Sequence, residues 1–132
     1  MAIRETVSFT TVLNRQLDRV AEAASELDFM SRMNGRRTLM RYLMRVRALY
    51  HLVKDIPLVK RHLSDWEDIL DKLFKITIFE RFNVRLKLPT GIVEIKQPYD
   101  VTKVLDDILG DIIDALFRSR LLIQIDYLGA ES

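Results

Sequence analysis

The stretch that decides the fold is residues 82–96, which read FNVRLKLPTGIVEIK. Apolar and polar side chains alternate over residues 82–88 and again over residues 92–96, which is the pattern of half-buried strands. Residues 89–91, Pro-Thr-Gly, supply a three-residue turn between the two strands. The stretch therefore predicts an antiparallel β-hairpin.

Upstream of this hairpin, apolar residues recur at steps of three and four, which predicts helices. Two helices are expected, over residues 11–33 and 36–54, because Asn34-Gly35 tolerates the left-handed conformation of a helix end. A capping box of Ser64 and Glu67 predicts a third helix to about residue 75, with Trp66 on its buried side.

Residues 76–79 fit a further short strand. Downstream of the hairpin, Asp100 is a good N-cap for a helix that ends near residue 118. Residues 121–128 are again typical of a strand. A strand, a helix and a second strand suggest a right-handed crossover.

The fold class is therefore α+β, with a helical N-terminal half packed on a small sheet of hairpin, crossover helix and strand. With 132 residues, of which 48% are hydrophobic, we expect a single domain over residues 1–132. Residues 11–75 form its helical, basic part, and residues 76–129 form the hairpin-helix-strand part.

Composition excludes several classes of function. The chain has no cysteine, which removes disulfides, thiolate catalysis and cysteine-ligated zinc. Its two histidines are too few for a zinc site, and we expect neither metal nor cofactor. Residues 1–11 lack the apolar segment of a signal peptide, and no apolar run is long enough to span a membrane.

The net charge of +2 hides a strong asymmetry. Residues 32–61 hold nine basic side chains and one acid, whereas the remainder holds twelve basic and eighteen acidic side chains. The nine are Arg32, Arg36, Arg37, Arg41, Arg45, Arg47, Lys54, Lys60 and Arg61. Such segregation is typical of a polyanionic partner or of an acidic neighbouring subunit, and the alternative is a solvated helix face.

Glu94 and Lys96 lie two residues apart on a strand and therefore share one face. A carboxylate beside a lysine is able to hold a divalent cation and to activate water for attack on a phosphate. The commoner alternative is a salt-bridged strand edge.

The succession of a strand, a turn, a strand ending in VEIK, a helix and the residues LIQIDYLG resembles the core of PD-(D/E)XK nucleases. More specifically, residues 79–129 look like the CRISPR-associated RecB-family exonucleases. Asn83, Arg85 and Lys87 stand where that family needs its aspartate, and the Gln-x-x-x-Tyr motif and iron–sulfur cysteines are missing. The resemblance implies an inactive remnant of the nuclease core. An active metal-dependent nuclease, the alternative, would use Glu94 and Lys96 as catalytic residues.

Inactivated relatives of this nuclease form the nucleocapsid of filamentous archaeal viruses. The resemblance therefore implies a non-enzymatic coat protein of a virion, present in the host cytoplasm during assembly. The nine basic residues would hold linear duplex DNA independently of sequence. Asp107, Asp111 and Asp114 would dock the next subunit of a homo- or hetero-oligomer with a related coat protein. A further alternative is a helical subunit whose basic helix docks an acidic protein.

Some smaller signals have competing interpretations. Arg45 and His51 match the loose spacing of helical ribonucleases of the HEPN superfamily, but a partly buried structural histidine is the favoured interpretation. Trp66 and Tyr50 are interpreted as core rather than as base-stacking residues. The methionines at positions 30, 33, 40 and 44 fill gaps at a helix junction or form a seam with a partner.

Overall fold

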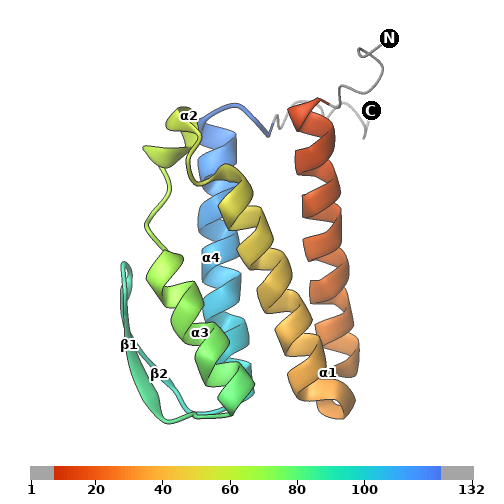
Figure 1. Ribbon diagram of the computed structural model, residues 1–132, viewed down its shortest axis with the longest axis vertical. Helices are drawn as coiled ribbons and strands as arrows, with labels where there is room; N and C mark the ends of the chain where they lie inside the picture. Colours follow the sequence, from red (N-terminus) through yellow and green to blue (C-terminus); the bar gives the residue numbers. More distant parts are fainter. Residues whose placement is uncertain (1–7, 123–132) are drawn as a thin grey trace.

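The computed structural model describes residues 8–122, except for the side chains of residues 28–34. Within these residues the chain forms helices and one β-hairpin, which makes the protein an α+β structure (Figure 1). The elements in chain order are α1 (Phe9–Val53), α2 (Pro57–Lys60), α3 (Glu67–Phe79), β1 (Val84–Leu88), β2 (Gly91–Ile95) and α4 (Pro98–Arg118).

Helix α1 folds back on itself, as Figure 1 shows. We call residues 9–27 its N-arm and residues 35–53 its C-arm. The carboxylate of Glu26 contacts the guanidinium of Arg41, although a straight helix would separate these residues by about 22 Å along its axis. The predicted helix end at Asn34-Gly35 is wrong: Gly35 lies inside α1 and its φ angle is not positive. The chain reverses near the expected place, but with a helical backbone.

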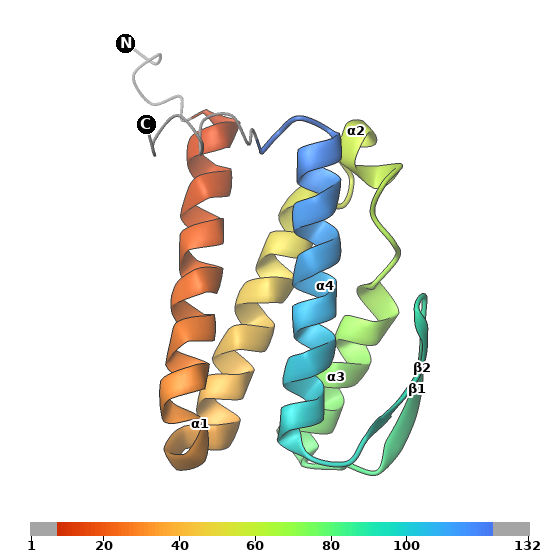
Figure 2. The same cartoon turned by 180° about the vertical axis from the view of Figure 1, so that it is seen from behind.

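The two arms of α1 run alongside α3 and α4, and the hairpin lies at the outer edge of this bundle (Figures 1 and 2). Each arm turns one row of apolar side chains inward, as the spacing of three and four predicts. The C-arm row of Leu39, Leu43, Val46, Tyr50 and Val53 is buried. The core is one contiguous set of buried side chains from the helices and the hairpin.

The predicted hairpin is confirmed, with one change at its turn. Leu88 pairs with Gly91, so the turn consists of Pro89 and Thr90 alone, not of three residues. Gly91 begins β2 with a φ of 138°, a conformation that side-chain-bearing residues rarely adopt. The alternation places Leu86, Leu88 and Ile95 in the core.

Helix α3 differs from the prediction at both ends. The capping box is wrong, because Trp66 is the N-cap without a side-chain hydrogen bond and Asp65 Oδ1 accepts from the Glu67 N–H at 3.1 Å. The strand at residues 76–79 is also wrong: Ile76 and Thr77 are buried on α3, where they continue the row of Leu70 and Leu73. β-branched residues favour strands locally, but burial against the bundle keeps these residues helical.

Helix α4 ends at Arg118 as predicted, but its N-cap is Gln97 rather than Asp100. Asp100 occupies the third helical position, where its Oδ2 accepts from the N–H groups of Lys96 (2.8 Å) and Gln97 (3.1 Å). The prolyl ring of Pro98 fits the first turn, because the N–H that proline lacks has no partner there.

The sheet of the described residues is the hairpin β1–β2 alone. The strand predicted at residues 121–128 falls almost entirely outside the described residues, so the crossover and the remnant nuclease core stay predictions. None of the helices described is long and apolar enough to cross a membrane.

Candidate nucleic-acid interface

The C-arm of α1 positions the basic side chains opposite its buried row. Arg37, Arg41 and Arg45 follow one another at steps of four, so they lie on one side of the helix. Arg36 and Arg37 are exposed, as is Arg41, while Arg45 is half-buried. These three guanidiniums therefore form a stripe along the surface of the C-arm.

Beside α3 these side chains line a hollow of about 520 Å³. We call it the arginine hollow; its lining residues are Arg36, Arg37, Met40, Arg41, Met44, Arg45 and Ile78. Ile78 comes from α3, and both Ile78 and Met44 are 42% exposed. The hollow thus combines four cationic groups with apolar surface.

Two of the four arginines contact carboxylates from other segments. Arg36 Nη1 donates to Glu80 Oε2, and Arg41 Nη1 donates to Glu26 Oε1. All four of these side chains are 40% exposed or more. Arg37 and Arg45 form no ion pair within the part of the chain that the structure describes. The hollow therefore carries an excess of positive charge.

Arg47 lies apart from the arginine hollow. Its Nη2 is 3.3 Å from Asp71 Oδ1 on α3, and its Nε is buried without a hydrogen-bond partner among the described residues. A guanidinium held between two helices is a poor phosphate contact, so Arg47 fits the predicted binding set least well. The side chain of Arg32 lies outside the described residues.

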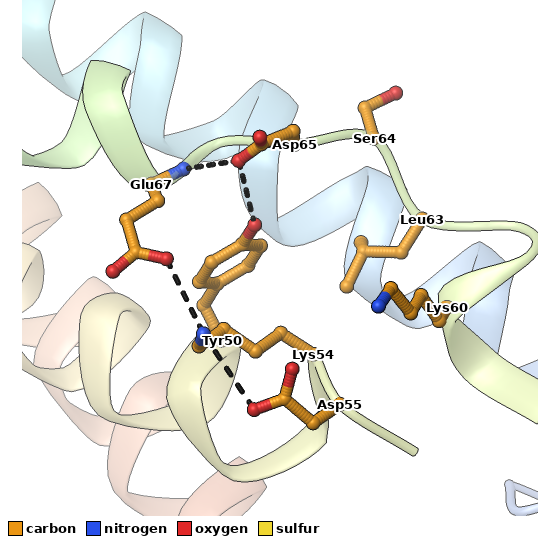
Figure 3. A pocket seen from close by; sticks show the side chains of 8 residues that line it. All are labelled: Tyr50, Lys54, Asp55, Lys60, Leu63, Ser64, Asp65 and Glu67. Atoms are coloured by element: carbon orange, nitrogen blue, oxygen red, sulfur yellow. Dashed lines mark hydrogen bonds and ion pairs between the residues drawn. The ribbon is translucent and has the colours of Figure 1, made fainter. Parts of the chain in front are cut away.

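Lys54 and Lys60 line a second hollow of about 320 Å³, where α1 ends (Figure 3). Lys54 Nζ lies 3.3 Å from Glu67 Oε1 and 3.6 Å from Asp55 Oδ2. The hydrogen bond with Glu67 raises the pKa of Lys54 above its usual range. Lys60 and Arg61 are exposed.

Carboxylates outnumber lysines around this second hollow, since Asp55, Asp65 and Glu67 all line it. Lys54 also lies about 13 Å along the helix axis from Arg45. Of the nine predicted basic residues, four thus line the arginine hollow, Lys54 and Lys60 lie in a region of mixed charge, and Arg47 is held by Asp71.

Tyr50 and Trp66 are core residues, as the sequence predicts. The Tyr50 hydroxyl accepts from the backbone N–H of Trp66 at 3.0 Å and donates to Asp65 Oδ1 at 3.4 Å (Figure 3 shows the latter bond). Burial raises the pKa of Tyr50. The expectation of a partly buried His51 is wrong, because this residue is exposed. Its ring forms a T-shaped pair with that of Tyr50, with the ring centroids 5.8 Å apart.

Glu94 and Lys96 do share the outer face of the hairpin. Glu94 Oε2 lies 3.2 Å from Arg85 Nη2, directly across the strand pair, and Glu94 Oε1 lies 3.4 Å from Lys96 Nζ. The hydrogen bonds from Arg85 and Lys96 hold the pKa of Glu94 below its usual range. This arrangement is the salt-bridged strand edge. Among the side chains that the structure describes, no group of three His, Cys, Asp or Glu residues is placed to hold a metal ion.

The three acids expected to share one face of α4 do not all have the same surroundings, and Asp111 is the one that differs. Its Oδ2 accepts from Trp66 Nε1 at 2.8 Å and from the Ser64 N–H at 3.0 Å, so this carboxylate is used inside the protein. Asp107 and Asp114 are exposed, and Asp114 Oδ2 lies 2.9 Å from Arg118 Nε. Asp107 and Asp114 are therefore the exposed acids of the predicted docking face, whereas Asp111 Oδ2 already accepts two hydrogen bonds within the protein.

Comparisons with protein-family models, curated proteins and solved structures gave no significant match to the chain. The candidate interface is thus defined by geometry. Sequence reasoning missed Glu26, Ile78 and Glu80, because each meets the C-arm only through the tertiary fold. No local pattern marks a contact between residues 44 positions apart, such as Arg36 and Glu80.

Proposed function

We propose that the protein is a non-enzymatic, sequence-independent nucleic-acid-binding protein whose arginine hollow holds the phosphate backbone. The observation that carries this proposal is the convergence of Arg36, Arg37, Arg41 and Arg45 on one hollow. Guanidinium groups suit this task because their planar fork of donors matches the oxygens of a phosphate.

The spacing of these arginines fits an extended backbone. Arg37 and Arg45 are eight residues apart, which corresponds to about 12 Å along the C-arm. Along the axis of a duplex, where each strand rises roughly 3.4 Å per phosphate, that span corresponds to about three to four phosphate steps. Contacts to phosphates position a protein on nucleic acid without reading its bases.

The concrete form of this function is a nucleocapsid protein that wraps linear duplex DNA in the virion of a filamentous archaeal virus. This part of the proposal is supported by the resemblance of residues 79–129 to an inactive PD-(D/E)XK core. It includes assembly into a homo-oligomer, or into a hetero-oligomer with a related coat subunit. The ion pair of Glu94 with Arg85 is in keeping with lost catalysis, because a guanidinium occupies a carboxylate oxygen that a divalent cation would need.

The test is a gel-shift assay with labelled linear duplex DNA and Mn²⁺ across a salt series. We expect intact, retarded DNA whose retention falls as the salt concentration rises. Replacement of Arg37 and Arg45 by alanine should weaken binding at least tenfold. The matched control replaces Arg15 and Arg19, two exposed arginines of the N-arm that do not line the hollow, and should change binding far less.

Three outcomes would contradict the proposal. Shortened DNA, with cleavage abolished by Glu94→Ala, would establish the metal-dependent nuclease. Equal losses in both double variants would mean that net charge, and not the arginine hollow, drives binding. Neither retardation nor cleavage would mean that the hollow serves another partner.

The alternative partner for the arginine hollow is an acidic protein. The apolar part of the lining of the hollow is the observation that favours a protein partner. Methionine and arginine are both enriched at protein interfaces, and Met44 and Ile78 are substantially exposed here. An acidic amphipathic helix would use both features. Ile78→Ser would then weaken that complex, whereas phosphate binding by the arginines would be almost unaffected.

A further inference from the structure

The arginine hollow is bordered by two carboxylates that come from different elements. Glu26 belongs to the N-arm of α1, and Glu80 follows the last residue of α3. Each contacts one guanidinium of the hollow, Arg41 and Arg36 respectively. The tertiary fold, not the helix that carries the arginines, therefore delivers both acids.

The position of Glu80 is fixed by the way in which α3 ends. Glu80 has a φ of 52°, in the left-handed region that residues other than glycine seldom adopt. Its backbone N–H is bonded to the carbonyls of Ile76 and Thr77, which closes the helix. The side chain that leaves this left-handed residue is the one that meets Arg36.

A carboxylate and a phosphate compete for the same donors of a guanidinium. Both ion pairs are open to solvent, with side chains 40–60% exposed, so each stabilises the free protein only slightly and is able to exchange. Arg37 and Arg45 form no such pair within the described residues and remain available to the first phosphates.

We infer that Glu26 and Glu80 act as internal competitors for the arginine hollow and thereby set its affinity for nucleic acid. This inference rests on the proposed function and adds to it a means of regulating affinity. Loss of either carboxylate frees one guanidinium for a phosphate. The two acids weaken binding without preventing it, because the unpaired arginines are unaffected.

The test measures binding of a labelled 12-base-pair duplex by fluorescence anisotropy, with Glu26→Gln, Glu80→Gln and the double variant. Glutamine keeps the shape of the side chain and removes its charge. We expect each single variant to bind the duplex about two- to fivefold more tightly, because the interaction lost in each variant is a single solvent-exposed ion pair. The double variant should show about the product of the two effects.

The matched control is Glu22→Gln, which removes the same charge one helical turn before Glu26. Glu22 is exposed and contacts none of the hollow's arginines among the described residues. At 0.15 M salt, electrostatic interactions between exposed charges are screened over about 8 Å, so the loss of a charge that does not contact the hollow should have little effect on DNA binding. This variant should therefore bind the duplex nearly as tightly as the wild type does.

Two results would overturn the inference while the proposed function stands. One is an affinity in the Glu26 and Glu80 variants no higher than that of the Glu22 variant. The other is weaker binding, which would mean that the carboxylates position the guanidiniums for phosphate. Failure of every protein, wild type included, to bind the duplex would instead overturn the proposed function and the inference with it.

Discussion

The hydroxyl of Tyr50 connects the C-arm of α1 to the start of α3. It accepts from the Trp66 N–H. It also donates to Asp65, which in turn accepts from the Glu67 N–H, and Figure 3 shows these two bonds. Tyr50 is only 3% exposed, so a phenolate there would lose its hydration and face a carboxylate. That environment explains why the pKa of Tyr50 is raised.

Tyr50→Phe should therefore lower the free energy of unfolding by about 1–3 kcal/mol at pH 7, because the buried Trp66 N–H loses its acceptor. Because the pKa of Tyr50 is raised in the folded state, its neutral phenol favours folding. This contribution to the free energy of unfolding is complete below the unfolded-state pKa of about 10, and it is lost as the pH rises through the folded-state pKa. The difference in the free energy of unfolding between wild type and Tyr50→Phe should consequently become smaller above pH 10. Urea unfolding followed by circular dichroism from pH 7 to pH 11 measures this.

The control is Tyr99→Phe, at a side chain that is 64% exposed, where the change should stay within about 0.5 kcal/mol at every pH. If the difference in the free energy of unfolding between wild type and Tyr50→Phe became larger above pH 10, the assigned role of Tyr50 would be contradicted.

At the scale of elements, the spacing of apolar residues in the sequence correctly predicted which rows of side chains are buried. It did so because the side chains on one face of a helix or strand recur with the period of that element. The alternation of residues 84–95 and the C-arm row from Leu39 to Val53 are both in place. Helix starts were less predictable: Ser64 and Asp100 are good local caps, yet both helices begin at other residues. In each case a tertiary contact or a neighbouring cap outweighed the local preference.

The candidate site was predictable only in part, for a related reason. The arginine stripe is a property of one helix and follows from its sequence. The hollow exists because α3 brings Ile78 beside that stripe, and its net charge depends on Glu26 and Glu80. These are contacts between elements, which no local pattern encodes.

Two glycines in different elements give opposite predictions for the same substitution. Gly110→Ala should raise the free energy of unfolding by about 0.5–1 kcal/mol, because Gly110 is helical and an added Cβ meets nothing within 4 Å. Gly91→Ala should lower it by about 1–3 kcal/mol, since alanine is strained at a φ of 138°. Chemical denaturation of both variants measures the two changes. A loss of stability in Gly110→Ala would show that this face of α4 is not open.

At the scale of the whole molecule, the fold gathers part of the charge that the sequence concentrates in residues 32–61. Arg36, Arg37, Arg41 and Arg45 share one hollow, whereas Arg47 and Lys54 are engaged by carboxylates elsewhere. The salt dependence of duplex binding counts the phosphates that a protein neutralises, with a slope of about −0.9 for each.

Four contacts predict a slope of log K against log salt of about −3.6, and nine would give about −8. We expect the smaller value for a 12-base-pair duplex, because only these four arginines converge on one hollow, whereas Arg47 and Lys54 are ion-paired away from it. Arg37→Ala with Arg45→Ala should reduce the magnitude of the slope by about two. A wild-type slope near −8 would mean instead that the other five basic residues of the segment 32–61 also reach the DNA, so that the whole basic segment and not the hollow forms the interface.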